Sequence, residues 1–255
     1  MEPKATERFT NVVEDYARYR PGYPDAAIDC LMRIPGLRAG DSVADIGSGT
    51  GIMSRCLLDQ GLTVYAVEPN DAMRAEAERE AGDREGFHSV AGTAETTTLA
   101  DASVRLAVCA QAFHWFEPEA CHGEFRRILA PQGYLAVLWN DRREYSTPLM
   151  RDYEALLLKF CPEYPKVKSR DQNFEALDTV FGSSQYKKYA YENGQYFDRE
   201  GFLGRVRSCS YVPGAGHPNF QPLMDALNKL YDECAEDGCI EFVYETQVFI
   251  GALTD

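Results

Sequence analysis

The chain has 255 residues, of which 45% are hydrophobic and 26% are charged, and its formal net charge is −14. A chain of this length and composition can fold as one large globular domain, or as a domain that carries a cap. The acidic balance argues against nucleic acid or an anionic membrane surface as a partner, because both attract basic protein faces. The eight cysteines show no zinc-ligand spacing, and no apolar stretch is long enough to span a bilayer. We therefore expect a reduced, cytoplasmic protein without a metal site.

The first two thirds of the chain predict a regular alternation of strands and helices. A helix is expected at 24–32, before the first strand. The strands are expected at 42–46, 63–68, 87–91, 105–110 and 134–140, and helices at 52–60, 71–81 and 117–129 fill most of the gaps. Five strands separated mainly by helices predict a parallel sheet that is covered on both faces.

The alternation changes after residue 140. Residues 141–185 are polar, contain three prolines and one clear helix at 149–160, and are interpreted as a substrate cap inserted over the carboxyl edge of the sheet. The remaining elements are expected as a strand at 186–191, helices at 198–208 and 222–234, and a strand at 240–250. The last strand alternates apolar and polar residues, which is typical of an antiparallel strand near a sheet edge.

The expected fold is thus α/β: a doubly wound, mostly parallel seven-stranded sheet with an antiparallel edge strand and an inserted helical cap. Four parts are expected along the chain. They are N-terminal lid helices at 1–35, a cofactor-binding core at 36–140, the cap at 141–185, and the rest of the sheet with C-terminal helices at 186–255.

One motif points to a ligand. Asp45 ends the first predicted strand, and Gly47, Gly49 and Gly51 follow at alternate positions before a helix. Glycine allows a sharp turn and close approach of a ligand, and the first N–H groups of a helix favour polar or anionic groups. A dinucleotide site would place glycine or alanine where Ile52 stands, and Asp45 would repel a pyrophosphate.

The motif Asp-x-Gly-x-Gly-x-Gly resembles the first motif of class I S-adenosylmethionine-dependent methyltransferases. The resemblance implies S-adenosylmethionine as the cofactor, with Asp45 toward its ammonium group and Glu68 accepting both ribose hydroxyls. It also places the adenine beside Thr93 and Ala94. The residues expected around the cofactor are Arg20, Asp45, Gly47, Ser48, Gly49, Glu68, Pro69, Met73, Thr93, Ala94, Glu95 and Gln111.

Residues 16–24 resemble the N-terminal lid of the ubiquinone-biosynthesis and trans-aconitate methyltransferases, which implies a small-molecule acceptor. The residues expected toward the acceptor are Tyr16, Tyr19, Trp115, Trp139 and Arg142. His114 is either a general base or substrate partner, or a structural histidine. Arg20 either pairs with the methionine carboxylate or flanks a helix at the surface. Arg142 and Arg143 could neutralise an acidic acceptor, although a solvated loop is the favoured interpretation.

The predicted function is methyl transfer from S-adenosylmethionine to a small-molecule acceptor by in-line displacement, with a carboxylate as one candidate acceptor. Two alternatives stay open. One is an NAD(P)-dependent oxidoreductase, and the other is a non-catalytic regulatory protein that binds S-adenosylmethionine. The sequence predicts no oligomeric state.

Overall fold

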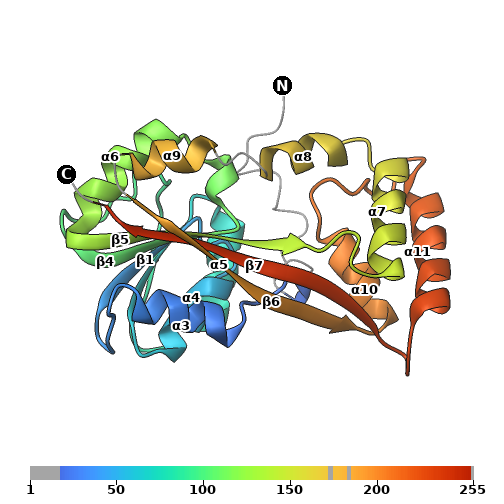
Figure 1. Ribbon diagram of the computed structural model, residues 1–255, viewed down its shortest axis with the longest axis horizontal. Coiled ribbons are helices and arrows are strands. Elements are labelled where there is room, and N and C mark those ends of the chain that lie inside the picture. The colour runs from blue at the N-terminus through green and yellow to red at the C-terminus, as the bar shows by residue number, and fades with distance from the viewer. Residues whose placement is uncertain (1–17, 172–174, 183–184, 254–255) are drawn as a thin grey trace.

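The computed structural model describes residues 18–171, 175–182 and 185–253. Its strands form one mixed sheet in the order β3-β2-β1-β4-β5-β7-β6 (Figure 1). The strands are β1 (Ser42–Ile46), β2 (Thr63–Val67), β3 (Phe87–Val90), β4 (Val104–Ala110), β5 (Leu129–Arg142), β6 (Lys187–Phe197) and β7 (Ile240–Ala252). Strands β1 to β5 pair in parallel, and β7 is antiparallel to both β5 and β6. The predicted seven-stranded sheet with an antiparallel strand near one edge is confirmed.

Helices follow most of the strands. They are α3 (Asp25–Arg33), α4 (Ile52–Asp59), α5 (Asp71–Ala81), the short 3-10 helix η1 (Phe113–Trp115), α6 (Pro118–Ile128), α7 (Pro148–Phe160), α8 (Tyr164–Asp171), α9 (Glu175–Phe181), α10 (Arg199–Arg207) and α11 (Phe220–Cys234). Local sequence features explain where several of these helices begin. Proline opens α6 and α7, and the side chains of Thr147 and Asp198 accept backbone N–H groups in the first turns of α7 and α10.

Two apolar clusters cover the two faces of the sheet. On one face, Phe125 and Ile128 of α6 pack with Val180 and Phe181 of α9 against the buried strands. On the other face, the apolar sides of α3 and α4 pack against the same strands. Because both faces of β1 and β4 are covered, their sequences are almost continuously apolar.

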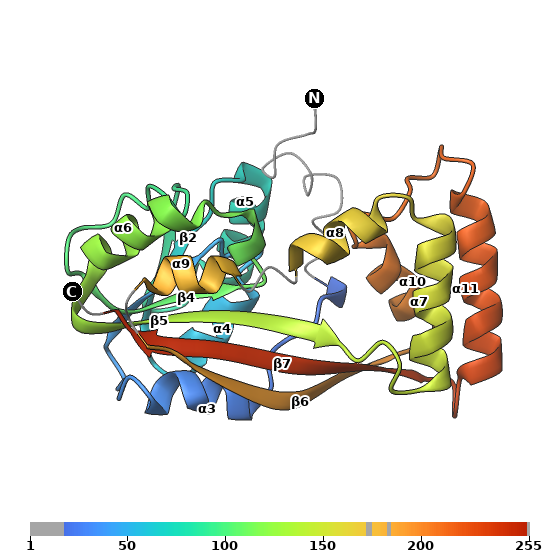
Figure 2. The same ribbon diagram turned by 45° about the horizontal axis from the view of Figure 1, so that its top comes forward.

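A third apolar cluster lies beyond the carboxyl ends of the parallel strands. Strands β5, β6 and β7 extend past the other strands, and α7, α10 and α11 gather at their far end (Figure 2). Tyr153, Phe202 and Phe242 are at the centre of this cluster, with the Tyr153 and Phe242 rings 4.9 Å apart. Helices α7, α10 and α11 form a lobe opposite the β1–α4 turn. From here on, the word cap refers to this lobe and not to the predicted segment 141–185.

The helices of the cap come from different segments than expected. Helix α9 lies within the predicted cap segment of residues 141–185, but it packs against α6 on the sheet. Helices α10 and α11, from the segment 186–255, pack with α7 instead. An apolar helix face indicates that a helix is buried, but it does not identify the surface that buries it. The division of the chain into four parts stays a prediction.

Candidate functional site

The glycine turn has the geometry that its sequence predicts. Gly47, Gly49 and Gly51 have φ angles of 70°, 55° and 78° between β1 and α4. These positive values suit glycine and are costly for other residues. A Cβ atom on Gly47 would also lie 2.7 Å from the Cβ of Ala112, just after β4. The turn is therefore packed closely against the end of the neighbouring strand.

Three residues that line the pocket beside this turn have buried polar atoms without partners among the described residues. Asp45 Oδ2 accepts a hydrogen bond from Ser54 Oγ at 2.6 Å, but Oδ1 has no partner among the described residues. The same holds for Ser48 Oγ and Thr50 Oγ1, and all three residues line the pocket. Burial raises the pKa of Asp45 to about 7. Because buried polar groups are normally hydrogen-bonded, this end of the pocket fits a polar ligand that carries donors.

Glu68 supports the turn from the end of β2. Its carboxylate accepts the backbone N–H of Gly49 at 2.9 Å and that of Asn70 at 2.8 Å. Burial raises its pKa, and only 8% of the residue is exposed. Each carboxylate oxygen keeps a further lone pair, so Glu68 still fits the predicted pairing with two hydroxyls. Of its predicted neighbours, Pro69 is exposed and Met73 is buried beside Gly49.

The residues predicted beside the adenine follow β3. Thr93 is exposed, Ala94 is buried, and Glu95 accepts the backbone N–H of Glu117 at 3.1 Å, just before α6. These residues, like Glu68, Pro69 and Met73, are outside the set that lines the pocket. Their contacts with a cofactor stay predictions.

The end of β4 contributes Gln111 to the pocket. Gln111 has a φ of 59°, and its backbone N–H donates to Leu138 O at 2.9 Å. His114 and Trp115 follow in η1, with their rings 5.1 Å apart and both side chains partly exposed. Neither residue lines the pocket, and the predicted role of His114 as a base stays untested.

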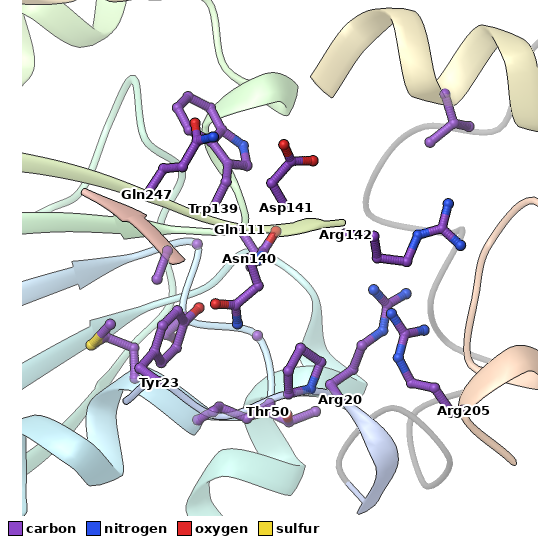
Figure 3. Close-up of a pocket in the computed structure, with 18 of the residues that line it drawn as sticks. Arg20, Tyr23, Thr50, Gln111, Trp139, Asn140, Asp141, Arg142, Arg205 and Gln247 are labelled. Atoms are coloured by element: carbon purple, nitrogen blue, oxygen red, sulfur yellow. The ribbon is translucent and has the colours of Figure 1, made fainter. Parts of the chain in front are cut away.

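The cap end of the pocket contains several basic side chains. Arg20 from the N-terminal segment, Arg142 from β5 and Arg205 from α10 all line it, and Figure 3 shows their guanidinium groups in the same part of the pocket. Lys168 and Tyr164 of α8 lie on this side as well. The pocket therefore extends from the glycine turn to a group of cations in the cap.

Arg142 is held by a buried network. Its Nη2 donates to Glu154 Oε2 at 3.0 Å and to Tyr164 Oη. Glu154 also accepts from Tyr164 Oη at 2.6 Å and from Lys168 Nζ at 2.9 Å. The favoured sequence interpretation of a solvated loop is wrong for Arg142, because β5 continues to this residue and directs it into the cap. The side chain of the next residue, Arg143, is instead exposed and pairs with Glu245 at the surface.

The other predicted acceptor residues lie in different surroundings. Trp139 lines the pocket, and its Nε1 is buried without a hydrogen-bond partner among the residues described. Tyr19 is outside the pocket lining: its ring packs against Gly204 of α10, and its carbonyl accepts from Gln195 Nε2 at 3.2 Å. Arg20 donates to Ser208 O at 3.0 Å. These contacts join the N-terminal segment to the cap, and Tyr16 lies outside the described residues.

Three residues from the last third of the chain line the pocket although the sequence did not predict them there: Arg205, Tyr211 and Gln247. One signal was present for Arg205. It occupies the same helix face as Phe202 and Val206, and an arginine on an otherwise apolar face is unusual.

The described residues contain neither a metal-binding cluster nor a membrane-spanning helix. No group of three or more histidine, cysteine or acidic side chains is placed to hold a metal ion in that part of the chain. None of its helices is long and apolar enough to cross a membrane.

Comparisons with known proteins agree on one family. A family model described as a methyltransferase domain matches residues 44–137. An uncharacterized methyltransferase from Mycobacterium bovis is 38% identical over 140 residues, which is 53% of each chain and thus about half the length of that relative. An uncharacterized methyltransferase-like protein from Schizosaccharomyces pombe is 30% identical over 94% of this chain and 93% of its own. A candidate type II methyltransferase structure from Anaeromyxobacter dehalogenans superposes with a TM-score of 0.65 at 22% identity, covering 92% of this chain and 98% of its own.

Proposed function

Because the chain belongs to the class I S-adenosylmethionine-dependent methyltransferases, we propose that it transfers a methyl group from S-adenosylmethionine to a small-molecule acceptor. A carboxylate is one candidate for the accepting group. Family membership disfavours the dinucleotide alternative, in agreement with Ile52 and Asp45 at the glycine turn.

The observation that carries this proposal is the pocket with two chemically different ends. At the glycine turn, Asp45 Oδ1 and Ser48 Oγ are buried polar atoms without described partners, which fits the amino-acid part of the cofactor. At the other end, side chains of the cap and of β5 surround the remaining space. A single pocket of this kind can hold a cofactor and a small acceptor next to each other.

The chemistry requires positioning more than reactive side chains. Bound S-adenosylmethionine supplies an electrophilic methyl group, so the protein has to align the acceptor and exclude water. Alignment of this kind can contribute roughly 7–11 kcal/mol to the lowering of a barrier. In this role Asp45 would pair with the cofactor ammonium group, Glu68 would accept the ribose hydroxyls, and the cap would shield the acceptor.

The accepting group decides whether a base is needed. A carboxylate can attack without losing a proton, whereas a phenol or an amine has a proton to transfer. His114 remains the predicted base for the second case. Retention of activity in His114→Ala with a carboxylate acceptor would agree with direct attack.

Calorimetry and a turnover assay test the proposal together. We expect S-adenosylmethionine to bind and NAD not to bind, with at least about tenfold loss of S-adenosylmethionine affinity in Asp45→Asn. Asp29→Asn, which removes an exposed carboxylate from α3, serves as the matched control. Incubation with a library of small acceptors should then release S-adenosylhomocysteine. Tight NAD binding without S-adenosylmethionine binding would refute the proposal, and binding without any turnover would favour the regulatory alternative.

A further inference from the structure

Arg205 is a buried cation that has no carboxylate partner in the described part of the chain. Only 5% of the residue is exposed, although it lines the pocket. Its Nε donates to Tyr244 Oη at 3.2 Å, and its Nη1 lies 2.9 Å from Cys209 Sγ. Among the described residues, none of the ion pairs involves Arg205. A buried charge normally has a counter-ion, because removal from water is otherwise strongly unfavourable.

Two carboxylates at the cap end, Glu144 and Glu154, are already engaged by other cations. Glu154 pairs with Arg142 at 3.0 Å and with Lys168 at 2.9 Å, and Glu144 pairs with Lys168 at 2.6 Å. This arrangement balances Arg142 and Lys168 but leaves Arg205 uncompensated. The second terminal nitrogen of Arg142, Nη1, is also buried and has no hydrogen-bond partner in the described part of the chain.

Three arginines line the cap end of the same pocket. In Figure 3, the guanidinium groups of Arg20, Arg142 and Arg205 are seen in the same part of the pocket, and the charges of all three act to lower the pKa of the Cys209 thiol. Like charges gathered in one part of a pocket repel each other, and an anion between them removes this repulsion. Planar guanidinium groups bind carboxylate and phosphate oxygens with paired hydrogen bonds, so an oxyanion is the complementary partner.

Cys209 indicates how strong the positive field is. Burial raises the pKa of the Cys209 thiol, but the positive charges of Arg205 and Arg20 together outweigh this effect. The pKa is therefore lowered from the ordinary value of 9.0 to about 7. A thiol that is partly ionised near neutral pH is an incomplete counter-ion. Binding of an external anion beside Arg205 would take over this role.

We propose that Arg205 and Arg142 form an anion-binding subsite in the cap, which holds an oxyanion of the methyl acceptor. The proposal rests on the proposed methyl transfer and names its substrate class: a small molecule that carries a carboxylate or a phosphate. The subsite holds its anion on the cap side of the pocket, opposite Asp45.

Two anions serve as probes, because the acceptor is unidentified. The protein is saturated with S-adenosylhomocysteine and titrated in a calorimeter with succinate and, separately, with inorganic phosphate. We expect the wild type to bind at least one of them, and the preferred anion distinguishes a carboxylate site from a phosphate site. Arg205→Gln should weaken that binding at least about tenfold, with Arg205→Lys intermediate because it keeps the charge but not the paired geometry.

The matched control is Arg199→Gln on the same helix. Arg199 is exposed and pairs with Asp232, so this variant should bind the anion as the wild type does. Arg205→Gln should also change the affinity for S-adenosylmethionine less than about threefold, which separates this inference from the proposed function. If S-adenosylmethionine fails to bind the wild type, the proposed function fails. If it binds but neither anion does, or if Arg205→Gln leaves anion binding intact, only the subsite is refuted.

Folding of the variants provides a second readout. Removal of an uncompensated buried charge should not lower the melting temperature of the ligand-free protein, so Arg205→Met should melt at or above the wild-type temperature. Added succinate or phosphate should raise the melting temperature of the wild type but not that of Arg205→Met. A melting temperature well below that of the wild type, with an unchanged response to the anions, would assign Arg205 a structural role and overturn the proposal.

Discussion

The two ends of the pocket are built in opposite ways. The glycine turn at the cofactor end belongs to one continuous segment, in which β1, the turn and α4 follow each other between residues 42 and 59. The cap end brings together Arg20, Arg142, Lys168 and Arg205, which are separated by up to 185 positions in the chain. A local motif can be recognised from spacing alone, whereas a site assembled from distant segments depends on how the helices pack.

The largest effect is expected at the cofactor end from Gly47→Ala. The new Cβ would lie 2.7 Å from the Cβ of Ala112 at a residue with a φ of 70°, so the turn has to shift. We expect S-adenosylmethionine affinity to fall by about a hundredfold and the free energy of unfolding to fall by about 2 kcal/mol. Calorimetry and urea denaturation measure the two quantities.

Gly36→Ala isolates the effect of the backbone angle. Gly36 has a φ of 66°, but a Cβ atom there would meet nothing within 4 Å. This control should lose some stability while keeping its cofactor affinity. Equal loss of affinity in both variants would contradict the close packing of the turn as the cause.

A pH dependence is expected at the same end from Asp45. Its pKa of about 7 means that the carboxyl becomes neutral as the pH falls below 7, and the cofactor ammonium group then loses its partner. Wild-type affinity for S-adenosylmethionine should therefore fall up to about tenfold per pH unit between pH 7 and pH 5.5, and Asp45→Asn should show a flat profile. Calorimetry across this range measures both.

The stability of the ligand-free protein should change in the opposite direction. Because the folded-state pKa of Asp45 lies above the ordinary value of 3.8, the folded protein binds more protons than the unfolded chain between about pH 4 and 7. The free energy of unfolding should thus decrease as the pH rises through this window. Asp45→Asn should lack this component, and a variant that keeps it would show that another group is responsible.

The smallest effect is expected at the cap end from Tyr164→Phe. The hydroxyl of Tyr164 donates to Glu154 at 2.6 Å within the buried network, so its removal should lower the free energy of unfolding by about 1 kcal/mol. The matched control is Tyr196→Phe, in which an exposed hydroxyl that donates to Glu241 is lost with almost no change. Similar values for the two variants in urea denaturation would show that the cap network does not contribute to stability.

The sheet was largely predictable because its signals are local. The apolar runs of β1 and β4 and the turn residues between elements identify buried parallel strands without knowledge of their neighbours. The end of β6 was not predictable in the same way. Residues 192–195, Glu-Asn-Gly-Gln, are typical of a turn, yet Gly194 pairs with Val243 because the apolar side of β7 fixes the register.

The candidate site was predictable only where chemistry and spacing coincide. Asp45 and the glycines form a motif within seven residues, so their places in the pocket followed from the sequence. Arg142 and Arg205 have no such motif. Their position in the pocket depends on the continuation of β5 and on the packing of α10 against β7, which no local pattern encodes.

The long pairing of β6 with β7 has a consequence for how such a protein can change. The ladder joins Lys187 with Ile250 at one end and Phe197 with Ile240 at the other. The chain that leaves at Phe197 therefore returns directly beside its point of departure, after α10 and α11. An excursion whose ends are already adjacent can be lengthened, shortened or exchanged at little entropic cost. Arg205 belongs to this replaceable excursion, whereas Asp45 does not, so acceptor preference can diversify while the methyl donor stays the same.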